Sequence, residues 1–227
     1  MNVCKEDNLL PRNKYPEETI EKILDASLKL FLEKGYEETT VLDIVENLGG
    51  LTRGAFYHHF KSKEEVLYAI FEKDTNLVNI IFEKAKNAKV KNGLERLKLA
   101  LKLATGHTSE AAGIRFNVMK LAISILSSPR FLAEHIKDTQ FSAKLIEPLI
   151  AEGMADGSIE PRNPKIIAEL LMLLSNIWIM PNIFPCENDE MSEKIQLIAE
   201  IFKYLGLNFL DEEIANNAIE AMDNIQM

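Results

Sequence analysis

The chain has 227 residues, of which 47% are hydrophobic and 27% charged, a composition typical of ordinary globular proteins. These fractions exclude intrinsic disorder and a collagen-like repeat, and 2 cysteines are too few for a disulfide scaffold. The 26 Lys and Arg and 35 Asp and Glu give a net charge of -9, which excludes a polycation that coats nucleic acid, so any contact with DNA has to be local.

The N-terminal segment carries the charged residues Lys5, Arg12 and Lys14 and no apolar stretch, a pattern that indicates no secretory leader. The two cysteines, Cys4 and Cys186, lie far apart in the sequence. We therefore expect a cytoplasmic protein without a disulfide.

Helical periodicity runs through the chain, and alternation of the strand type is nearly absent. The first helix is predicted over 16–34, because Pro16 suits its start, Gly35 suits its end, and apolar residues between them share one face. That face contains Ile20, Ile23, Leu24, Leu28 and Phe31.

Three further helices are predicted from their first residues. Thr40 and Asp43 form a capping-box pattern that opens a short helix over 41–48, which ends at a pair of glycines. Thr52 caps a second short helix over 53–59. Ser62 with Glu65 opens a longer helix that runs toward residue 86.

The second part of the chain is predicted to contain longer and more apolar helices, over 94–105, 111–127, 130–153, 164–180, 191–209 and, weakly, 211–224. The segment 164–180 is apolar on nearly every side, yet Glu169 within it makes a membrane span unfavourable. Such a helix has to be covered on two faces. We therefore expect no membrane contact and a homodimer formed through the helices near 164–180 and 191–209.

The two short helices at 41–48 and 53–59, with a Gly-containing turn between them, have the spacing of a helix-turn-helix. Small residues, Gly54 and Ala55, stand at the N-terminal end of the second helix beside Arg53, as entry into a major groove requires. Leu48, Phe56 and Phe60 are expected to form the core below. Groups that can hold phosphates surround the second helix, namely Thr40, Thr52, Tyr57, His58, His59 and Lys63.

The run EKILDASLKLFLEKGYEETTVLDIVENLGGLTRGAFYHHFKSKEEVL, from Glu21 to Leu67, resembles the N-terminal domain of the TetR family of bacterial transcriptional regulators. The resemblance rests on motifs that occur in the same order as in the family. These are the Leu-Phe near the end of the first helix, Gly35-Tyr36, Thr39-Thr40, Asp43-Ile44, the Gly54-x-x-Tyr57-x-His59-Phe60 string and Lys63.

The resemblance implies an all-α fold with two domains. An N-terminal arm and a three-helix helix-turn-helix domain are expected over 1–62, and a larger helical domain that dimerises and binds a small inducer is expected over 63–227. In the family, the residues that match Thr40, Thr52, Tyr57, His59 and Lys63 contact phosphates. Those that match Arg53, Gly54, Ala55, Tyr57 and His58 face base edges.

One departure from the family lies in the turn, because Gly49-Gly50-Leu51-Thr52 is one residue longer than the usual single-glycine turn. Either glycine can take the left-handed conformation that the turn needs, and Leu51 is expected to pack into the core. Residues 1 to 63 contain 9 Lys and Arg and 11 Asp and Glu, a net charge of 9 − 11 = −2. Each subunit is therefore expected to neutralise few phosphates. Two subunits together then have to supply enough contacts, and the binding of the dimer should still weaken steeply with salt.

Other interpretations of the same residues remain open. The cluster of Tyr57, His58 and His59 is also compatible with plain surface polarity, whereas a metal site is disfavoured because adjacent helical residues point about 100° apart. His107 and His135 are taken as ordinary histidines. No Gly-x-Ser-x-Gly, phosphate-binding glycine loop or His-Glu-x-x-His is present, so we expect neither an enzyme nor a cofactor.

The sequence thus predicts a homodimeric repressor that binds a palindromic double-stranded DNA operator and is released by a small-molecule inducer. The alternative is a protein of the same fold that acts through a protein partner without an inducer. Candidate pocket residues, each also compatible with ordinary core packing, are Leu103, His107, Arg115, Phe116, Met119, Phe141, Asn176 and Trp178.

Overall fold

The computed structural model describes residues 16–105, 110–125 and 128–226, which form α-helices and one π-helical turn and contain no strand. This confirms the all-α class. The helices are α1 (Pro16–Lys34), α2 (Val41–Asn47), α3 (Arg53–His59), α4 (Lys63–Lys86), α5 (Gly93–Thr105), α6 (Glu110–Ile125), α7 (Pro129–Ala155), α8 (Pro164–Leu173), α9 (Asn188–Tyr204) and α10 (Glu212–Gln226). The described residues up to Ile70 form one compact unit and those from Phe71 onward form another, so the division falls inside α4.

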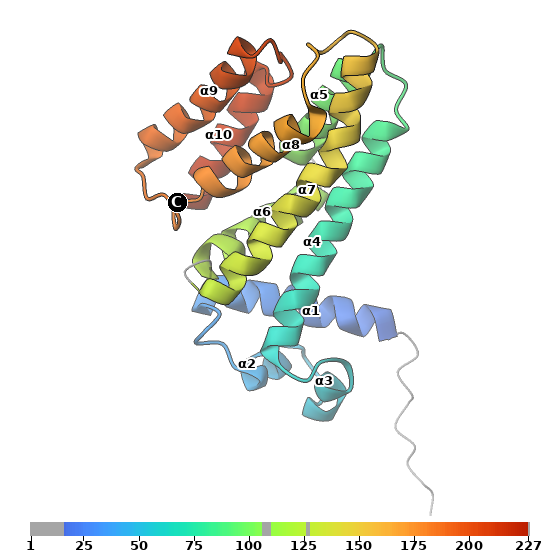
Figure 1. The fold of residues 1–227 in the computed structure, drawn as a ribbon. Coiled ribbons are helices and arrows are strands. Elements are labelled where there is room, and N and C mark those ends of the chain that lie inside the picture. Colours follow the sequence, from blue (N-terminus) through green and yellow to red (C-terminus); the bar gives the residue numbers. More distant parts are fainter. Residues whose placement is uncertain (1–15, 106–109, 126–127, 227) are drawn as a thin grey trace, which may run out of the picture. The chain divides into compact units, whose positions relative to one another are not determined.

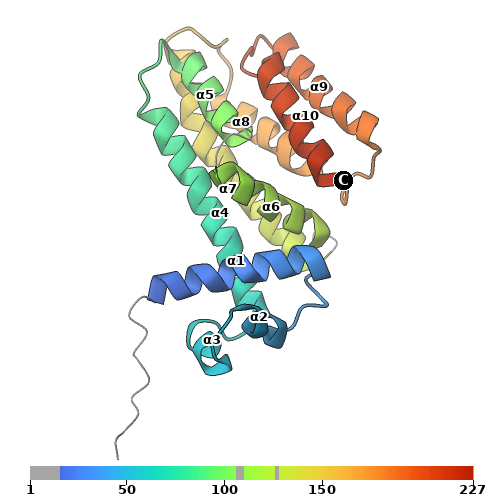
Figure 2. The same ribbon diagram turned by 180° about the vertical axis from the view of Figure 1, so that it is seen from behind.

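The N-terminal unit is built around an aromatic core. Phe31 of α1 and Phe56 of α3 are both fully buried, and Phe31 meets Tyr36 edge to face with 5.1 Å between ring centroids. Helix α2 packs on α1 and α3 packs on α2, and Figures 1 and 2 show both short helices on the same side of α1. Val66 and Leu67, in the first turns of α4, complete this core.

Two buried hydroxyl groups in this unit differ in their hydrogen bonding. Ser27 of α1 is fully buried, and its Oγ has no hydrogen-bond partner among the described residues. Thr39 is equally buried, but its Oγ1 donates to the Gly35 carbonyl at 2.7 Å and so ties the loop to the end of α1. Desolvation of a hydroxyl is therefore compensated at Thr39 and uncompensated at Ser27.

Replacing Ser27 with alanine is expected to raise the free energy of unfolding by about 1 kcal/mol, because the unsatisfied hydroxyl is removed at little cost in packing. Thr39→Val, a substitution of similar size, is expected to lower it by about 1 kcal/mol because a hydrogen bond is lost. Urea unfolding followed by circular dichroism measures both. A loss of stability in Ser27→Ala would mean that this hydroxyl has a partner in solution.

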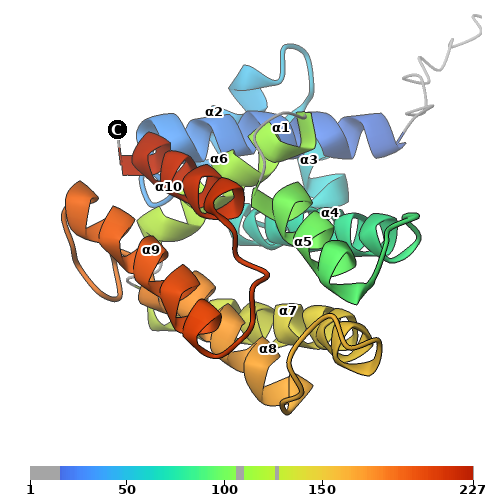
Figure 3. The same ribbon diagram turned by 90° about the horizontal axis from the view of Figure 1, so that it is seen from above.

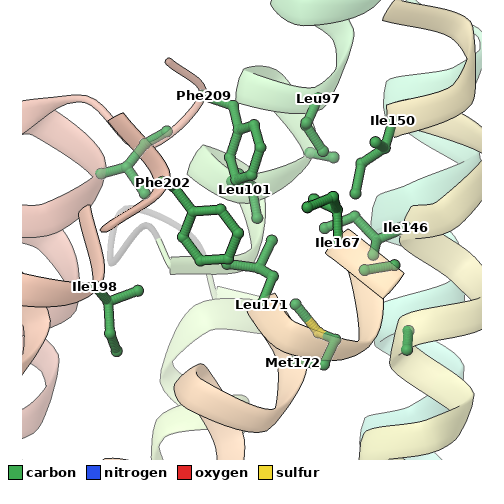
Figure 4. Close-up of a cluster of buried hydrophobic side chains, with 14 of the residues drawn as sticks. Leu97, Leu101, Ile146, Ile150, Ile167, Leu171, Met172, Ile198, Phe202 and Phe209 are labelled. Carbon is green, nitrogen blue, oxygen red and sulfur yellow. The ribbon is translucent and has the colours of Figure 1, made fainter. Parts of the chain in front are cut away.

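The C-terminal unit is a helical bundle. Helix α8 packs along α7, α7 also contacts α5, and α10 contacts both α9 and α5. Figure 3 shows α7 and α8 side by side. Figure 4 shows the apolar side chains that converge between these helices: Leu97, Leu101, Ile146, Ile150, Ile167, Leu171, Met172, Ile198, Phe202 and Phe209. The buried area of this core stabilises the second unit.

A polar cluster within this unit fixes the C-terminal end of α4. The Arg96 guanidinium donates to the carbonyls of Ala85, Lys86 and Ala88 at 2.9, 2.6 and 2.9 Å, and its Nε pairs with Glu152 at 3.0 Å. These carbonyls belong to the last turn of α4 and the residues after it, where an α-helix leaves acceptors unpaired. One α5 side chain therefore caps α4 and ties it to α7.

Two helix boundaries differ from the sequence prediction. The helix predicted over 164–180 is wrong in its second half, because α8 ends at Leu173 and residues Leu174–Trp178 form a π-helical turn ahead of Pro181. The helix predicted over 191–209 starts earlier and ends at Tyr204, since Gly206 takes a left-handed backbone with φ of +77°. None of the helices in the described ranges is long and apolar enough to cross a membrane.

Candidate nucleic-acid interface

The helix-turn-helix is built from α2, a tight turn and α3. The two glycines of the turn both adopt positive φ, +56° at Gly49 and +120° at Gly50, which explains why glycine stands at each position. Leu51 is half-buried. Thr52 then caps α3, because its Oγ1 accepts the backbone N–H of Ala55 at 3.2 Å.

Helix α3 has one buried and one exposed face. Phe56 and the following Phe60 are buried, as predicted, whereas Leu48 is only half-buried. The exposed residues include most of those predicted to meet DNA: Thr52, Arg53, Gly54, Tyr57 and His58. Ala55 and His59 are half-buried at the edge of this face. The aromatic core therefore fixes the helix from below and leaves a polar, small-residue surface on the outside.

Tyr57 and Arg53 form an ordered pair on that surface. Tyr57 is 44% exposed, and its ring stands edge to face on Phe56 with 5.5 Å between ring centroids. The Arg53 guanidinium carbon lies 5.6 Å from the centroid of the Tyr57 ring, a cation–π distance. The core thus orients the tyrosine, and the tyrosine in turn orients the arginine.

The capping box predicted for α2 is present. Thr40 Oγ1 accepts the N–H of Asp43 at 3.1 Å, and the Asp43 carboxylate accepts the Thr40 N–H at 2.7 Å. Lys34, at the end of α1, donates to the same carboxylate at 2.9 Å. These hydrogen bonds, with that of Lys34 first, hold the pKa of Asp43 well below its usual range. Lys34 was not among the residues predicted for the site. It lies nine residues from Asp43 on a different helix, and no local sequence pattern indicates that the two side chains pair.

The two histidines at the end of α3 stack edge to face, with 5.1 Å between their ring centroids. Partial burial, and then the charge of His58, lower the pKa of His59 below its usual value. The lowered pKa favours the neutral imidazole of His59 in the protein without DNA.

Lys63, the first residue of α4, is engaged inside the N-terminal unit. Its ammonium donates to the carbonyls of Tyr36 and Glu37 at 2.7 and 2.8 Å and lies 4.5 Å from the centroid of the Tyr36 ring. An ammonium has three donors, so two carbonyls leave one hydrogen for another acceptor. The structure thus gives Lys63 a role that the sequence did not indicate, which is to fasten α4 to the loop between α1 and α2.

Lys63→Met is expected to lower the free energy of unfolding by about 2 kcal/mol, because it removes charge-assisted hydrogen bonds to two carbonyls. Lys61→Met is the matched control, since Lys61 is an exposed lysine two residues earlier. Chemical denaturation of both variants tests the expectation. Equal stability of the two would show that the Lys63 contacts contribute nothing in solution.

The candidate pocket residues are spread over the C-terminal unit. Phe116 and Met119 of α6 and Trp178 of the π turn are half-buried and pack against its core, whereas Phe141 of α7 is 37% exposed. Leu103 on α5 is half-buried. His107 and the side chain of Arg115 lie outside the described part. No three His, Cys, Asp or Glu side chains that are described gather closely enough to hold a metal ion.

Asn176 also lies in the π turn, where its carbonyl accepts a hydrogen bond from His135 Nε2 at 2.7 Å. His135 was expected to be an ordinary histidine. A separation of 41 residues and a backbone acceptor leave no sequence signal for this contact.

Three comparisons with known proteins agree with this geometry. Residues 23–70 match the model of the bacterial regulatory proteins of the tetR family. The HTH-type transcriptional regulator SrpR of Pseudomonas putida is 46% identical over 54 residues, which are 24% of this chain and 25% of SrpR. This match therefore spans about a quarter of that relative.

Solved structures cover more of the chain. A transcriptional regulator from Aquifex aeolicus VF5 is 26% identical with a TM-score of 0.55, covering 82% of this chain and 99% of its own. The TetR-family regulator PfmR from Thermus thermophilus is 27% identical with a TM-score of 0.54, covering 84% of this chain and 96% of its own.

Fold and site together define a helix-turn-helix protein with a helical C-terminal bundle. Over residues 23–70 the chain matches the tetR family of bacterial regulatory proteins, and the solved structures of transcriptional regulators share the fold of the rest. The similar proteins named above are transcriptional regulators.

Proposed function

We propose that the protein is a homodimeric transcriptional repressor that places α3 of each subunit in the major groove of an inverted-repeat operator. The observation that carries the proposal is the exposed face of α3, where polar and small residues lie above a buried aromatic core. An α-helix fits the major groove of B-DNA, and a two-fold dimer spaces two such helices about 34–36 Å apart.

In this proposal the residues of α3 divide between bases and backbone. Arg53, Gly54, Ala55, Tyr57 and His58 face base edges, and Arg53 is suited to the two acceptors of a guanine. Its position over the Tyr57 ring supports this role, because a pre-oriented guanidinium loses less freedom on binding.

The phosphate contacts come from Thr40, Thr52, Tyr57, His59 and Lys63. Thr52 supports this assignment, since a hydroxyl that accepts the cap hydrogen bond still has a proton to donate. Few of these groups carry a charge, so the salt dependence per subunit is modest, and two subunits are needed for a useful affinity.

A small-molecule inducer is the further part of the proposal. It would bind in the C-terminal unit near Leu103, His107, Arg115, Phe116, Met119, Phe141, Asn176 and Trp178 and favour a dimer whose recognition helices no longer match the operator spacing. A difference in affinity between the two forms equivalent to about 1–3 kcal/mol suffices for such a response.

The test is DNA binding to inverted repeats taken from upstream of the protein's own gene, measured by fluorescence anisotropy against a scrambled duplex. We expect Arg53→Ala to lower affinity for the operator by about tenfold or more while changing affinity for the scrambled duplex much less. Equal losses on both duplexes would mean that Arg53 contacts only phosphate. Failure of the parent protein to bind any repeat at low salt would refute the proposed function itself.

A further inference from the structure

The π turn at the end of α8 leaves one backbone carbonyl with a choice of donors. In a regular α-helix the carbonyl of Asn176 would accept the N–H of Met180. In the structure the Met180 N–H donates to the Ile177 carbonyl at 3.2 Å, and the Asn176 carbonyl accepts from His135 Nε2 of α7 at 2.7 Å. A side chain of another helix has thus replaced the helix's own donor.

Both arrangements give the carbonyl of the half-buried Asn176 a hydrogen-bond donor, so neither state leaves it unsatisfied. A buried carbonyl without a donor is costly, so loss of the His135 bond has to be compensated by the Met180 N–H. Pro181 follows directly and has no backbone N–H to donate. Met180 is therefore the last residue whose backbone hydrogen bond changes between the two arrangements. The change is therefore confined to one turn.

We propose that residues 174–180 form a conformational switch, in which a π turn held by His135 alternates with a regular α-helical turn closed by Met180. A change from the π to the α hydrogen-bond pattern shifts the helical register by one residue. The side chains after the turn therefore rotate by about 100° around the helix axis. Trp178 is the side chain most affected, because it packs against the core and has the Lys194 ammonium 5.7 Å from its ring centroid. Lys194 also donates to the Phe184 carbonyl at 3.1 Å, so the switch changes the contacts of the loop before α9.

The switch has a chemical trigger. A molecule that offers His135 a hydrogen-bond acceptor in place of the Asn176 carbonyl favours the α-helical form, because it binds only the state in which the imidazole is released. The ligand class is therefore a compound that carries a carbonyl, carboxylate or similar acceptor. Neither state of the switch requires DNA to be bound.

The test uses the full chain and its single tryptophan, Trp178, as the reporter. His135→Phe keeps an aromatic ring and removes the donor, whereas His135→Gln keeps a donor at a similar reach. We expect His135→Phe to shift the Trp178 emission maximum and to slow exchange of the Met180 amide by about tenfold, and His135→Gln to match the parent protein in both. Unchanged emission and exchange in His135→Phe, or the same change in both variants, would overturn the proposal.

A measurement on the unmodified protein covers the case in which His135→Phe does not fold. Exchange between two hydrogen-bond patterns exposes the amides of 174–180 transiently, so these are expected to exchange about tenfold or more faster than those of 167–172. Equal protection of the two segments would overturn the switch without any variant.

Discussion

Replacing Gly54 with alanine is expected to make the protein more stable and, at the same time, a poorer DNA-binding protein. Gly54 is the second residue of α3, and an added Cβ would meet only Thr52 Oγ1, at an ordinary 3.8 Å. Alanine favours the helix over glycine by about 0.5–1 kcal/mol, so nothing in the described part of the chain accounts for glycine at this position.

We attribute this glycine to close approach of the α3 backbone to the operator. An extra methyl group in a tightly packed contact costs about 1–3 kcal/mol, so Gly54→Ala should lower operator affinity by about tenfold or more. Thermal unfolding and anisotropy on the same preparation measure both effects. An unchanged affinity would show that the N-terminal end of α3 does not approach DNA closely.

Gly50→Ala provides the contrast within the same motif. Gly50 also has open space where a Cβ would lie, with no atom of the described residues within 4 Å apart from its chain neighbours, but its φ of +120° is one that alanine rarely adopts. This variant should therefore lose stability through backbone strain alone. Glycine is thus needed at Gly50 for its backbone conformation and, in our proposal, at Gly54 for close approach to DNA.

Local signals in the sequence were sufficient for the elements of the N-terminal unit. The bounds of α1 and α3 follow from Pro16, Gly35 and Thr52, and the capping box of α2 is present as predicted. These features act over three or four residues, so they are visible in the sequence itself. The burial of Phe56 and Phe60 follows from their spacing in the same way.

Features that depend on long-range contacts were not predictable. Periodicity does not distinguish a π turn from an α-helical turn, and the π turn at 174–178 is supported by His135 from another helix. Lys63 shows the same limit, because its contacts lie 26 and 27 residues away in the sequence. From the sequence, a lysine beside a recognition helix is predicted to contact a phosphate of DNA. In the folded unit, Lys63 also holds the start of α4 to the loop between α1 and α2.

The apolar surfaces of α8 and α9 support the proposed homodimer. On each helix, apolar side chains at i, i+4 and i+7 form a stripe that the protomer leaves wholly or partly uncovered. The stripes are Ile166, Leu170 and Leu173 on α8 and Leu197, Ile201 and Tyr204 on α9. Ile166 is 58% exposed, Leu173 51% and Tyr204 89%, values that favour cover by a second copy.

The double variant Ile166→Glu with Leu173→Glu is expected to be monomeric at micromolar concentration and to lose operator affinity by about 100-fold or more. Two carboxylates in each copy of an apolar interface lose their solvation without a partner, which costs several kcal/mol. A monomer also contacts only one half-site of an inverted repeat. Light scattering after gel filtration measures the mass, and anisotropy measures DNA binding.

The control is Ile80→Glu on α4, because Ile80 is a similarly exposed isoleucine, 63%, that belongs to neither stripe. It is expected to leave both mass and DNA affinity unchanged. Because Ile166 and Leu173 are exposed in the protomer, the double variant should keep the helical circular dichroism of the parent, which separates dissociation from unfolding. A folded double variant that remains dimeric would place the interface elsewhere, and a folded Ile80→Glu variant that is monomeric would place it on α4.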